Sequence, residues 1–324
     1  MGNLSNDHFI AYAHSLWPDI VSRQGHDPTE FIGSLLKLRD QAGSERIVLG
    51  LASDSEKMIF KCRAEGANPK PIEVEIEATT KAHRAMAGRG RFMAPKLLAS
   101  SATDGWLLQS FEPGVTAKKI LEIQQDEPDL GREMRGEILT VVGAWLAAFH
   151  ASGGAQETFV QTATMRAHGD DVLASLLTKE IDPATAETFR QFGAVIHARA
   201  HEADGARTRA GVVHGDFVPQ NVLVHKEQVT GLDFSALHTG PNAHDQVKFL
   251  ARLYWDCPPE LVSEADFAAD VTAFEAGYGR DIEDDPAFSY LMPIQVLLDL
   301  AHPRTSGQRR ENLLALARLL VADG

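Results

Sequence analysis

A chain of 324 residues is long enough to form one large domain or two moderate ones, each with its own hydrophobic core. Hydrophobic residues make up 44% of it and charged residues 23%, the balance of a soluble globular protein, and no apolar run approaches the length of a membrane span. The net charge of −14 argues against nucleic acid as a partner, because binding a polyanion requires basic patches.

The two cysteines and the N-terminus indicate the cellular compartment in which the protein is expected. Cys62 and Cys257 are far apart and lack metal-type spacing, so we expect no disulfide framework, and a reducing cytoplasm fits best. Residues 1–14 show no basic flank followed by an apolar core, so we expect no secretory signal. The sequence therefore predicts a cytoplasmic protein that associates with neither membrane nor nucleic acid.

The first part of the chain predicts a helix followed by an antiparallel sheet. Apolar residues recur at helical spacing over residues 5–24. Three β-type runs follow at 31–39, 46–52 and 57–63, and the turns between them are short and polar. This arrangement is typical of an antiparallel meander.

Lys61 stands in the third run among apolar neighbours. Because burying an unpaired ammonium is costly, one reading is that Lys61 meets a partner in the fold. The other is that it points to water, as most lysines do, since Arg63 lies two residues on and shares its face.

The next elements complete the sheet and mark a lobe boundary. A helix and two more β-type runs are expected at residues 72–87, 95–99 and 106–111. Glu112-Pro113-Gly114 then breaks the pattern, and the periods beyond it become helical. We therefore expect an N-terminal lobe of residues 1–111 and a mainly helical C-terminal lobe of residues 112–324.

Residues 212–233 interrupt the helical part with two short apolar runs around a polar turn, which predicts a hairpin. Asp216 and Asn221 stand at its start and Asp233 at its end. Carboxylate and amide oxygens are hard ligands that suit Mg²⁺, which completes its shell with waters and phosphate oxygens. An ordinary surface hairpin with polar caps is the alternative, because Asp and Asn commonly occupy turns.

The same residues carry a resemblance to a known family. His214-x-Asp216 with Asn221 five residues after the Asp, followed by Leu232-Asp233-Phe234, resembles the catalytic loop and metal-binding Asp of the aminoglycoside phosphotransferase and choline kinase-like family. The resemblance implies an α+β, two-lobed protein-kinase-like fold with a small antiparallel-sheet N-lobe and a larger, mainly helical C-lobe. It extends over residues 30–300.

The resemblance also implies roles for individual residues. Asp216 would accept or orient the acceptor hydroxyl, and His214 would brace the catalytic loop by hydrogen bonding. Asn221 would take part in catalysis and, with Asp233, hold Mg²⁺. Asp245 resembles the family's structural Asp, which holds the catalytic loop.

The nucleotide site follows from the same resemblance. Lys61 would order the α- and β-phosphates and pair with a helix glutamate, for which we choose Glu77, with Glu73 next and Glu75 also on offer. Gly43 and Ser44 would lie in the loop over the phosphates. Ser110 and Phe111 are hinge candidates for backbone contact with the adenine. The sequence has no G-x-G-x-x-G loop at this point and no Walker motif.

The function that this implies is a small-molecule kinase that transfers the γ-phosphoryl group of ATP, or of GTP, to a hydroxyl with the help of Mg²⁺. The segment from Asp256 to Asp285 contains ten acidic residues and one basic residue. This acidity favours an amine-bearing acceptor, such as an aminoglycoside-like compound or metabolite. The alternative is that the acidic residues form a solvated helical face. Ser235 replaces the Gly of protein kinases, so a protein substrate is not expected.

Two other functions stay open. A catalytically inactive kinase-like protein would bind nucleotide or ligand without transfer, although Lys61, Asp216, Asn221 and Asp233 are all present. A metal-dependent hydrolase would use His214, Asp216 and His244, and would need a His-rich ligand set.

Overall fold

The structure is a computed structural model that describes residues 6–39, 45–64, 68, 70–123, 128–179, 181–257 and 262–322. The chain forms two compact units. The N-terminal unit comprises residues 1–113 together with 230–236, and the C-terminal unit comprises residues 114–229 and 237–324. The return of residues 230–236 to the N-terminal unit was not anticipated from the sequence.

The N-terminal unit is built on a five-stranded antiparallel sheet in the order β1-β2-β3-β6-β5. The predicted meander is therefore confirmed, and the two later runs add to its edge. The strands are β1 (Ile32–Arg39), β2 (Arg46–Ala52), β3 (Lys57–Arg63), β5 (Leu97–Ser101) and β6 (Trp106–Ser110). The other elements are α1 (Asn6–Arg23), η1 (Pro28–Glu30), α2 (Lys70–Met86), β4 (Phe92–Met93) and η3 (Phe234–Ala236).

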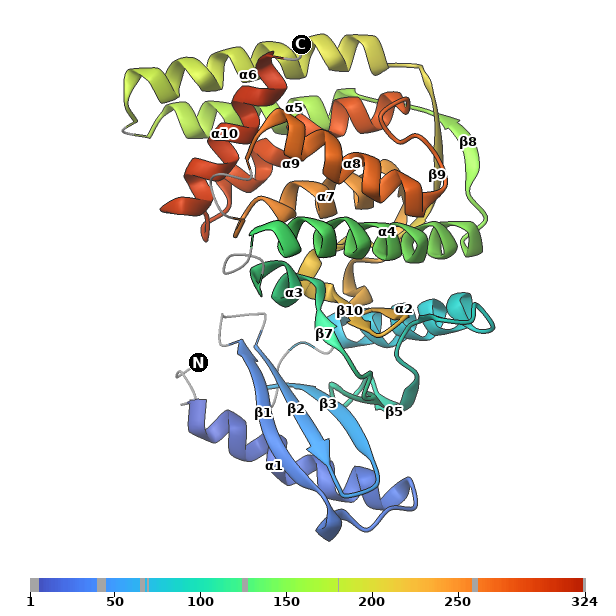
Figure 1. Cartoon of the computed structure of the whole chain (residues 1–324). Helices are drawn as coiled ribbons and strands as arrows, with labels where there is room; N and C mark the ends of the chain where they lie inside the picture. Colours follow the sequence, from blue (N-terminus) through green and yellow to red (C-terminus); the bar gives the residue numbers. More distant parts are fainter. Residues whose placement is uncertain are drawn as a thin grey trace. The chain divides into compact units, whose positions relative to one another are not determined.

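Alternation along the strands decides which side of this sheet is the core. In β3, Phe60 and Cys62 point to α1 and are fully buried there, with Ile47 and Leu49 of β2 beside them. Helix α1 covers this face (Figure 1). Lys61 lies between Phe60 and Cys62, so its side chain is on the opposite face of the sheet, away from the hydrophobic core under α1.

The C-terminal unit is mainly helical. Its helices are α3 (Ala117–Ile123), α4 (Pro128–Ser152), α5 (Ala163–Leu177), α6 (Pro183–Ala203), η2 (Pro219–Asn221), α7 (Ala243–Leu253), α8 (Glu264–Tyr278), α9 (Pro286–Ala301) and α10 (Gln308–Ala322). Its strands are β7 (Val115–Thr116), β8 (Gln156–Phe159), β9 (Arg207–Val213), β10 (Val222–His225), β11 (Gln228–Gly231, which runs on into the N-terminal unit) and β12 (His238–Pro241).

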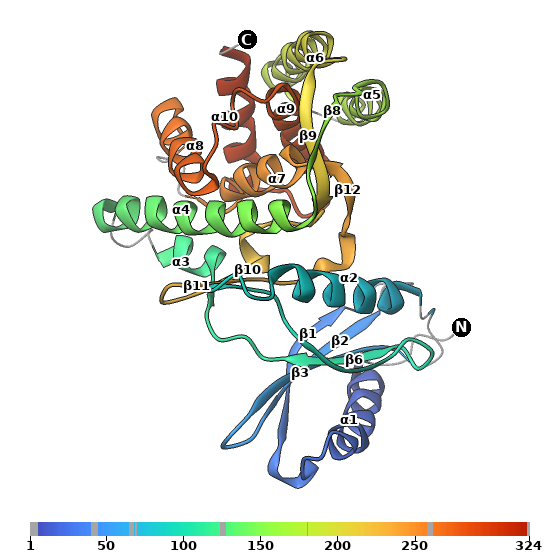
Figure 2. The same ribbon diagram turned by 90° about the vertical axis from the view of Figure 1, so that its right-hand side faces the viewer.

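Strand β9 leads directly into the loop of residues 214–221. It pairs antiparallel with β8 on one side and β12 on the other (Figure 2). The sequence suggested only Val212 and Val213 as its apolar part, whereas the strand begins at Arg207. The loop that follows leads through η2 into β10, which pairs with β7.

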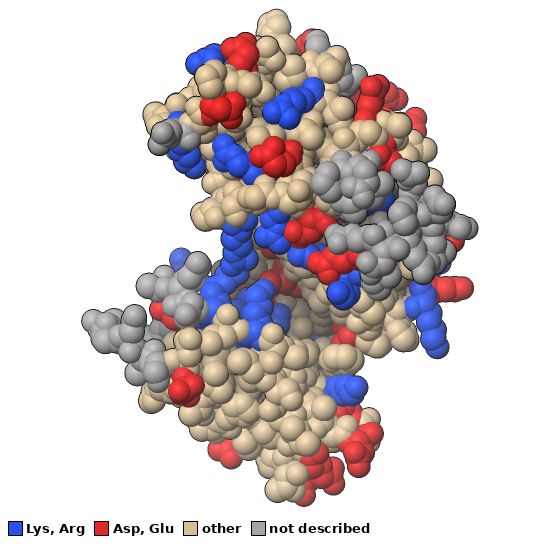
Figure 3. All heavy atoms as spheres, turned by 60° about the vertical axis from the view of Figure 1, so that its left-hand side comes forward, with Lys and Arg blue, Asp and Glu red and all other residues tan. Residues whose placement is uncertain are grey.

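Acidic and basic side chains are interspersed on the face of the C-terminal unit that Figure 3 displays. None of the helices in the described part of the chain combines the length and apolarity needed to cross a membrane.

Two glycines allow α4 and α8 to pack closely. A Cβ at Gly277 of α8 would overlap the carbonyl oxygen of Thr140 and lie 2.6 Å from its carbonyl carbon. A Cβ at Gly143 of α4 would overlap the carbonyl oxygen of Phe274 and lie 3.0 Å from the amide nitrogen of Tyr278. Because all of these neighbours are backbone atoms, a side chain at either position would have to push the helices apart.

We expect Gly277→Ala to lower the free energy of unfolding by about 1–3 kcal/mol, because overpacking a close helix contact forces backbone shifts. Gly136→Ala in α4 is the matched control, since a Cβ at that helical position meets open space. Denaturant unfolding of both variants measures the difference. Equal midpoints for the two variants would contradict the close packing.

Candidate functional site

The loop of residues 214–221, which was predicted to be catalytic, begins with a buried histidine. His214 is fully buried, and its ring lies 6.4 Å from that of Trp145 and 5.6 Å from that of Phe217. The backbone N–H of Asp216 donates to His214 Nδ1 over 3.4 Å. His214 therefore stands inside the loop and not at its surface, a position suited to bracing it.

A second buried group fixes the same loop. The carboxylate of Asp245, in the first turn of α7, accepts the backbone N–H of His214 at 2.7 Å and that of Gly215 at 2.8 Å. His150 Nε2 lies 3.0 Å from the same carboxylate, and His150 Nδ1 lies 2.8 Å from the hydroxyl of Tyr278. Burial opposes ionisation of Asp245, but hydrogen bonding and the charge of His150 lower its pKa below the ordinary value.

Asp216 presents a partly exposed carboxylate that is oriented from two sides. Its Oδ1 lies 2.9 Å from Lys248 Nζ, which also donates to the carbonyl of Gly215 over 2.8 Å. Asn221 Nδ2 donates to the backbone carbonyl of Asp216 at 2.9 Å and to its Oδ2 at 3.2 Å. The side chain of Asp216 is nevertheless 42% exposed, so another molecule can reach it.

Lys248 was missed by the sequence analysis. It lies on α7 three residues after Asp245, a spacing that places both on one face of the helix. Since Asp245 was already expected to hold the catalytic loop, this spacing was the available signal. Lys248 places a cation 2.9 Å from the carboxylate of Asp216.

In the N-terminal unit, Lys61 pairs with a glutamate of α2, but not with the one chosen. Lys61 Nζ lies 2.7 Å from Glu75 Oε1, and the side chain of Lys61 is only 9% exposed. The choice of Glu77 was wrong: it is exposed and pairs with Lys81 at 2.6 Å. Two residues along a helix turn the side chain by about 200°, so Glu75 and Glu77 cannot face the sheet together. Glu73, the second choice, is likewise not the partner.

Arg46 shares this glutamate. Its Nη2 lies 2.6 Å from the same Oε1 of Glu75, and its Nη1 lies 3.8 Å from Asp233 Oδ1. Burial opposes ionisation of Asp233, but Arg46, Lys61 and a hydrogen bond from Ser235 at 3.0 Å lower its pKa to about 2. Asp233 has a left-handed backbone, with φ of 60°, which Asp tolerates better than most residues.

Four further residues were predicted to contact the nucleotide, two in a loop and two at the hinge. Gly43 and Ser44 lie outside the described residues. Ser110 ends β6, and its hydroxyl donates to Glu112 Oε1 at 2.6 Å while accepting the backbone N–H of Lys96 at 2.8 Å. Phe111 is 39% exposed, and the ammonium of Lys57 lies 5.4 Å from its ring centroid.

The acids between Asp256 and Asp285 have structural partners in several cases. Asp270 is buried and takes two hydrogen bonds from Arg135, at 2.6 and 2.7 Å. Asp256 lies 2.6 Å from Lys118 Nζ and accepts a hydrogen bond from Arg309. Asp285 caps α9 by accepting the N–H of Ala287. These carboxylates are engaged in holding helices together.

The residues required by a metal-dependent hydrolase do not form a ligand cluster. Within the described ranges no group of three or more His, Cys, Asp or Glu residues is arranged to hold a metal ion. His214 is buried in the loop, and burial together with His238 lowers the pKa of His244. The hydrolase reading therefore gains no support.

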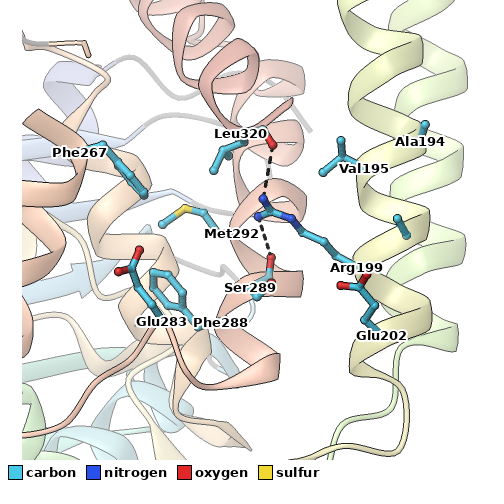
Figure 4. A pocket seen from close by; sticks show the side chains of 11 residues that line it. Ala194, Val195, Arg199, Glu202, Phe267, Glu283, Phe288, Ser289, Met292 and Leu320 are labelled. Carbon is cyan, nitrogen blue, oxygen red and sulfur yellow. Dashed lines mark hydrogen bonds between the residues drawn. The ribbon is translucent and has the colours of Figure 1, made fainter. Parts of the chain in front are cut away.

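A pocket of about 600 Å³ lies elsewhere in the C-terminal unit, between α6, α8, α9 and α10 (Figure 4). Arg199 of α6 crosses it and donates to the carbonyl of Ser289 at 3.3 Å and to that of Leu320 at 3.4 Å. None of the residues predicted for the active site lines this pocket.

Comparison with known families defines the class of protein. The model of the phosphotransferase enzyme family matches residues 48–287, most of the chain. The chain belongs to this family, so it is a phosphotransferase that acts on hydroxyl groups. It matches no curated protein.

Solved structures share its fold at low sequence identity. A glucosamine kinase is 18% identical with a TM-score of 0.58, over 94% of this chain and 82% of that one. A choline/ethanolamine kinase family protein from Mesorhizobium loti is 14% identical with a TM-score of 0.56, over 93% of each chain. A macrolide 2′-phosphotransferase from Brachybacterium faecium is 17% identical with a TM-score of 0.50, over 93% and 97%. These likenesses confirm the predicted α+β protein-kinase-like fold.

Proposed function

We propose that the chain is a small-molecule kinase that transfers the γ-phosphoryl group of ATP to a hydroxyl of a small acceptor. One observation carries this proposal: the reachable carboxylate of Asp216 is held by Asn221 and Lys248 in a loop that Asp245 fixes. A carboxylate with a fixed orientation can position a hydroxyl for attack, and positioning supplies much of the rate of phosphoryl transfer.

In the proposed reaction the acceptor hydroxyl donates a hydrogen bond to Asp216. Its oxygen forms a bond to the γ-phosphorus as the bond from that phosphorus to the bridging oxygen of ADP breaks, and the hydroxyl proton passes to Asp216 and on to solvent. Lys248 lies 2.9 Å from one carboxylate oxygen and so helps to fix the orientation of Asp216. His214 keeps its bracing role.

Asp233 and Asn221 are proposed to hold the Mg²⁺ that nucleotide donors require, and each offers an oxygen ligand of the kind that this ion binds. Asp233 is ionised at neutral pH, since its pKa is about 2, and Asn221 offers an amide oxygen while its Nδ2 is directed at Asp216. Such oxygen ligands, completed by water and phosphate, are what Mg²⁺ prefers. When bound, Mg²⁺ would neutralise charge on the phosphate oxygens. Lys61, held by Glu75, would contact the α- and β-phosphates.

For the acceptor we propose a hydroxylated small molecule that can carry an amine, such as an amino sugar, an amino alcohol or an aminoglycoside. Solved structures of this fold include a glucosamine kinase with glucosamine and ADP, and an aminoglycoside phosphotransferase with ADP and hygromycin B. The acids at 256–285 add little to this choice, because several of them hold helices together.

We also propose a cytoplasmic location. Cys62 and Cys257 are both buried free thiols, and burial raises the pKa of each to about 12. A reducing compartment, where nucleotide donors are abundant, suits such a protein.

Two measurements test the proposed function together. In a thermal-shift series, Mg-ATP should raise the unfolding temperature, because a ligand that binds only the folded state stabilises it. ADP release should then depend on the acceptor in a panel of amino sugars, amino alcohols and aminoglycosides. Stabilisation by Mg-ATP without release for any acceptor would favour the inactive binding protein.

We expect Glu75→Gln to lower kcat/KM for ATP by about 10²-fold, because Lys61 loses the carboxylate that fixes its position. Glu77→Gln, a matched change two residues away on the exposed side of α2, should leave the wild-type value. Steady-state kinetics with varied ATP measures both. Equal losses in the two variants would show that Glu75 has no special part in the site.

A further inference from the structure

The face of the N-terminal sheet opposite α1 carries several cationic side chains close together. In the strand register, Arg39 of β1 lies opposite Arg46 of β2, and Arg46 lies opposite Arg63 of β3. Two residues further along the same strands, Lys37 and Lys61 lie on either side of Val48. Residues that are directly opposite or two apart share a face of a sheet. The five side chains, Lys37, Arg39, Arg46, Lys61 and Arg63, are called here the cationic face.

Among the described residues, the carboxylates of Glu75, Asp233 and Glu45 contact this face. Glu75 uses one oxygen, Oε1, for both Lys61 and Arg46. The other two contacts are long, at 3.8 Å from Arg46 to Asp233 and 3.9 Å from Arg63 to Glu45. Within the described residues, the buried Nε of Arg46 meets no hydrogen-bond acceptor.

Like charges placed directly opposite each other destabilise a sheet. At Lys37, burial lowers the pKa and Asp233 raises it, while the charges of Arg46, Arg39 and Lys61 lower it further. At Arg63, likewise, burial and the neighbouring arginines lower the pKa, while Glu45 raises it. An anion bound at this face would therefore offset the repulsion between the cations, and an anion with several charges would offset it most.

We propose that Arg46 and Lys37 bind phosphate groups of the donor alongside Lys61, so that the triphosphate carries most of the donor's affinity. The inference rests on the proposed function and adds to it the residues that recognise the donor and the part of the donor they recognise. Arg46 suits this task because its planar guanidinium can keep Nη2 on Glu75 and direct Nη1, which is 3.8 Å from Asp233, to a phosphate oxygen.

Binding through the triphosphate affects which nucleotide donors the protein accepts. If the base contributes little, ATP and GTP bind with dissociation constants within about threefold of each other, a difference below 1 kcal/mol. Inorganic tripolyphosphate, which has no base, should compete with both. Adenosine, which has no phosphate, should bind far more weakly than either.

The experiment is calorimetric titration of the full chain with ATP, GTP, sodium tripolyphosphate and adenosine, each with Mg²⁺. Arg46→Gln should weaken ATP, GTP and tripolyphosphate by about tenfold or more, the effect expected for a charge-assisted hydrogen bond. Arg46→Lys should restore part of this loss. Arg89→Gln, an exposed arginine beyond the end of α2, should match the wild type.

Lys37→Gln gives a second readout that does not depend on Arg46. Lys37 is exposed, so the unfolding temperature of the ligand-free protein should stay near the wild-type value while tripolyphosphate binds more weakly. A variant that merely damages the fold would lower both the unfolding temperature and the affinity for tripolyphosphate. Wild-type affinity for tripolyphosphate in both Arg46→Gln and Lys37→Gln would overturn the proposal, as would tight ATP binding without tripolyphosphate binding.

Failure of the proposed function gives a different result. If tripolyphosphate binding depends on Arg46 but no acceptor is phosphorylated, the result supports phosphate binding by the cationic face and contradicts the proposed kinase activity. If phosphoryl transfer occurs and Arg46→Gln leaves triphosphate binding unchanged, the result supports the proposed kinase activity and shows that the cationic face has no part in donor binding.

Discussion

Asp216→Asn is expected to lower kcat by about 10²–10⁴-fold, the contribution of a positioned proton acceptor. The amide keeps the shape of the carboxylate but loses the charge that accepts the hydroxyl proton and binds Lys248 at 2.9 Å. The dissociation constant for Mg-ATP should change little, since Asp216 is proposed to act on the acceptor. Single-turnover kinetics with ATP and an active acceptor, together with nucleotide titration, separates the two effects.

Asp171→Asn is the matched control, because Asp171 is an exposed carboxylate on α5. It should retain wild-type turnover. Full activity in Asp216→Asn would remove Asp216 from the reaction, and with it the observation on which the proposed function stands.

Asp245→Asn is expected to lower the free energy of unfolding by about 3–5 kcal/mol, the cost of breaking a buried charge interaction. The carboxylate accepts two backbone N–H groups of the catalytic loop and contacts His150, so an amide NH₂ in its place would face donors. Turnover should fall as well, because the loop that carries Asp216 loses its anchor. Denaturant unfolding measures the stability of both proteins.

The same variant should have a defined pH dependence. The pKa of Asp245 is lowered in the folded chain from the ordinary 3.8, so its stabilisation is complete above that value and is lost as pH falls through the lower folded pKa. The stability difference between the wild type and Asp245→Asn should therefore be constant near neutrality and shrink below a pH of about 4. A difference that grows on acidification would show that Asp245 is not held as a carboxylate.

The sequence predicted the fold class, the family and the enzyme class, because the motif at 214–221 combines several residue types at fixed spacing and the strands alternate clearly. It also indicated a helix glutamate for Lys61, but not which one. Glu73, Glu75 and Glu77 alternate along α2, and only the rotation of the helix on the sheet selects Glu75. That rotation is set by tertiary packing, which local patterns do not record.

Other parts of the site depend on contacts between distant segments. The pairing of Lys248 with Asp216 joins α7 to the loop after β9, and the sharing of Glu75 by Arg46 and Lys61 joins β2 and β3 to α2. The concentration of cations became visible once the register placed Arg39, Arg46 and Arg63 opposite one another. In sequence these residues lie in separate runs, where each resembles an ordinary exposed arginine.

The central claim is that the chain moves the γ-phosphoryl group of a nucleotide to a hydroxyl through Asp216. Phosphorus NMR of Mg-ATP incubated with the wild type or Asp216→Asn and a panel of hydroxylated amines tests it most directly. We predict that the γ-phosphate signal gives way to ADP and a phosphate monoester in the wild type, and persists in Asp216→Asn. Equal persistence of the γ-phosphate in both proteins, with Mg-ATP bound, would contradict the account and identify a nucleotide-binding protein without transfer activity.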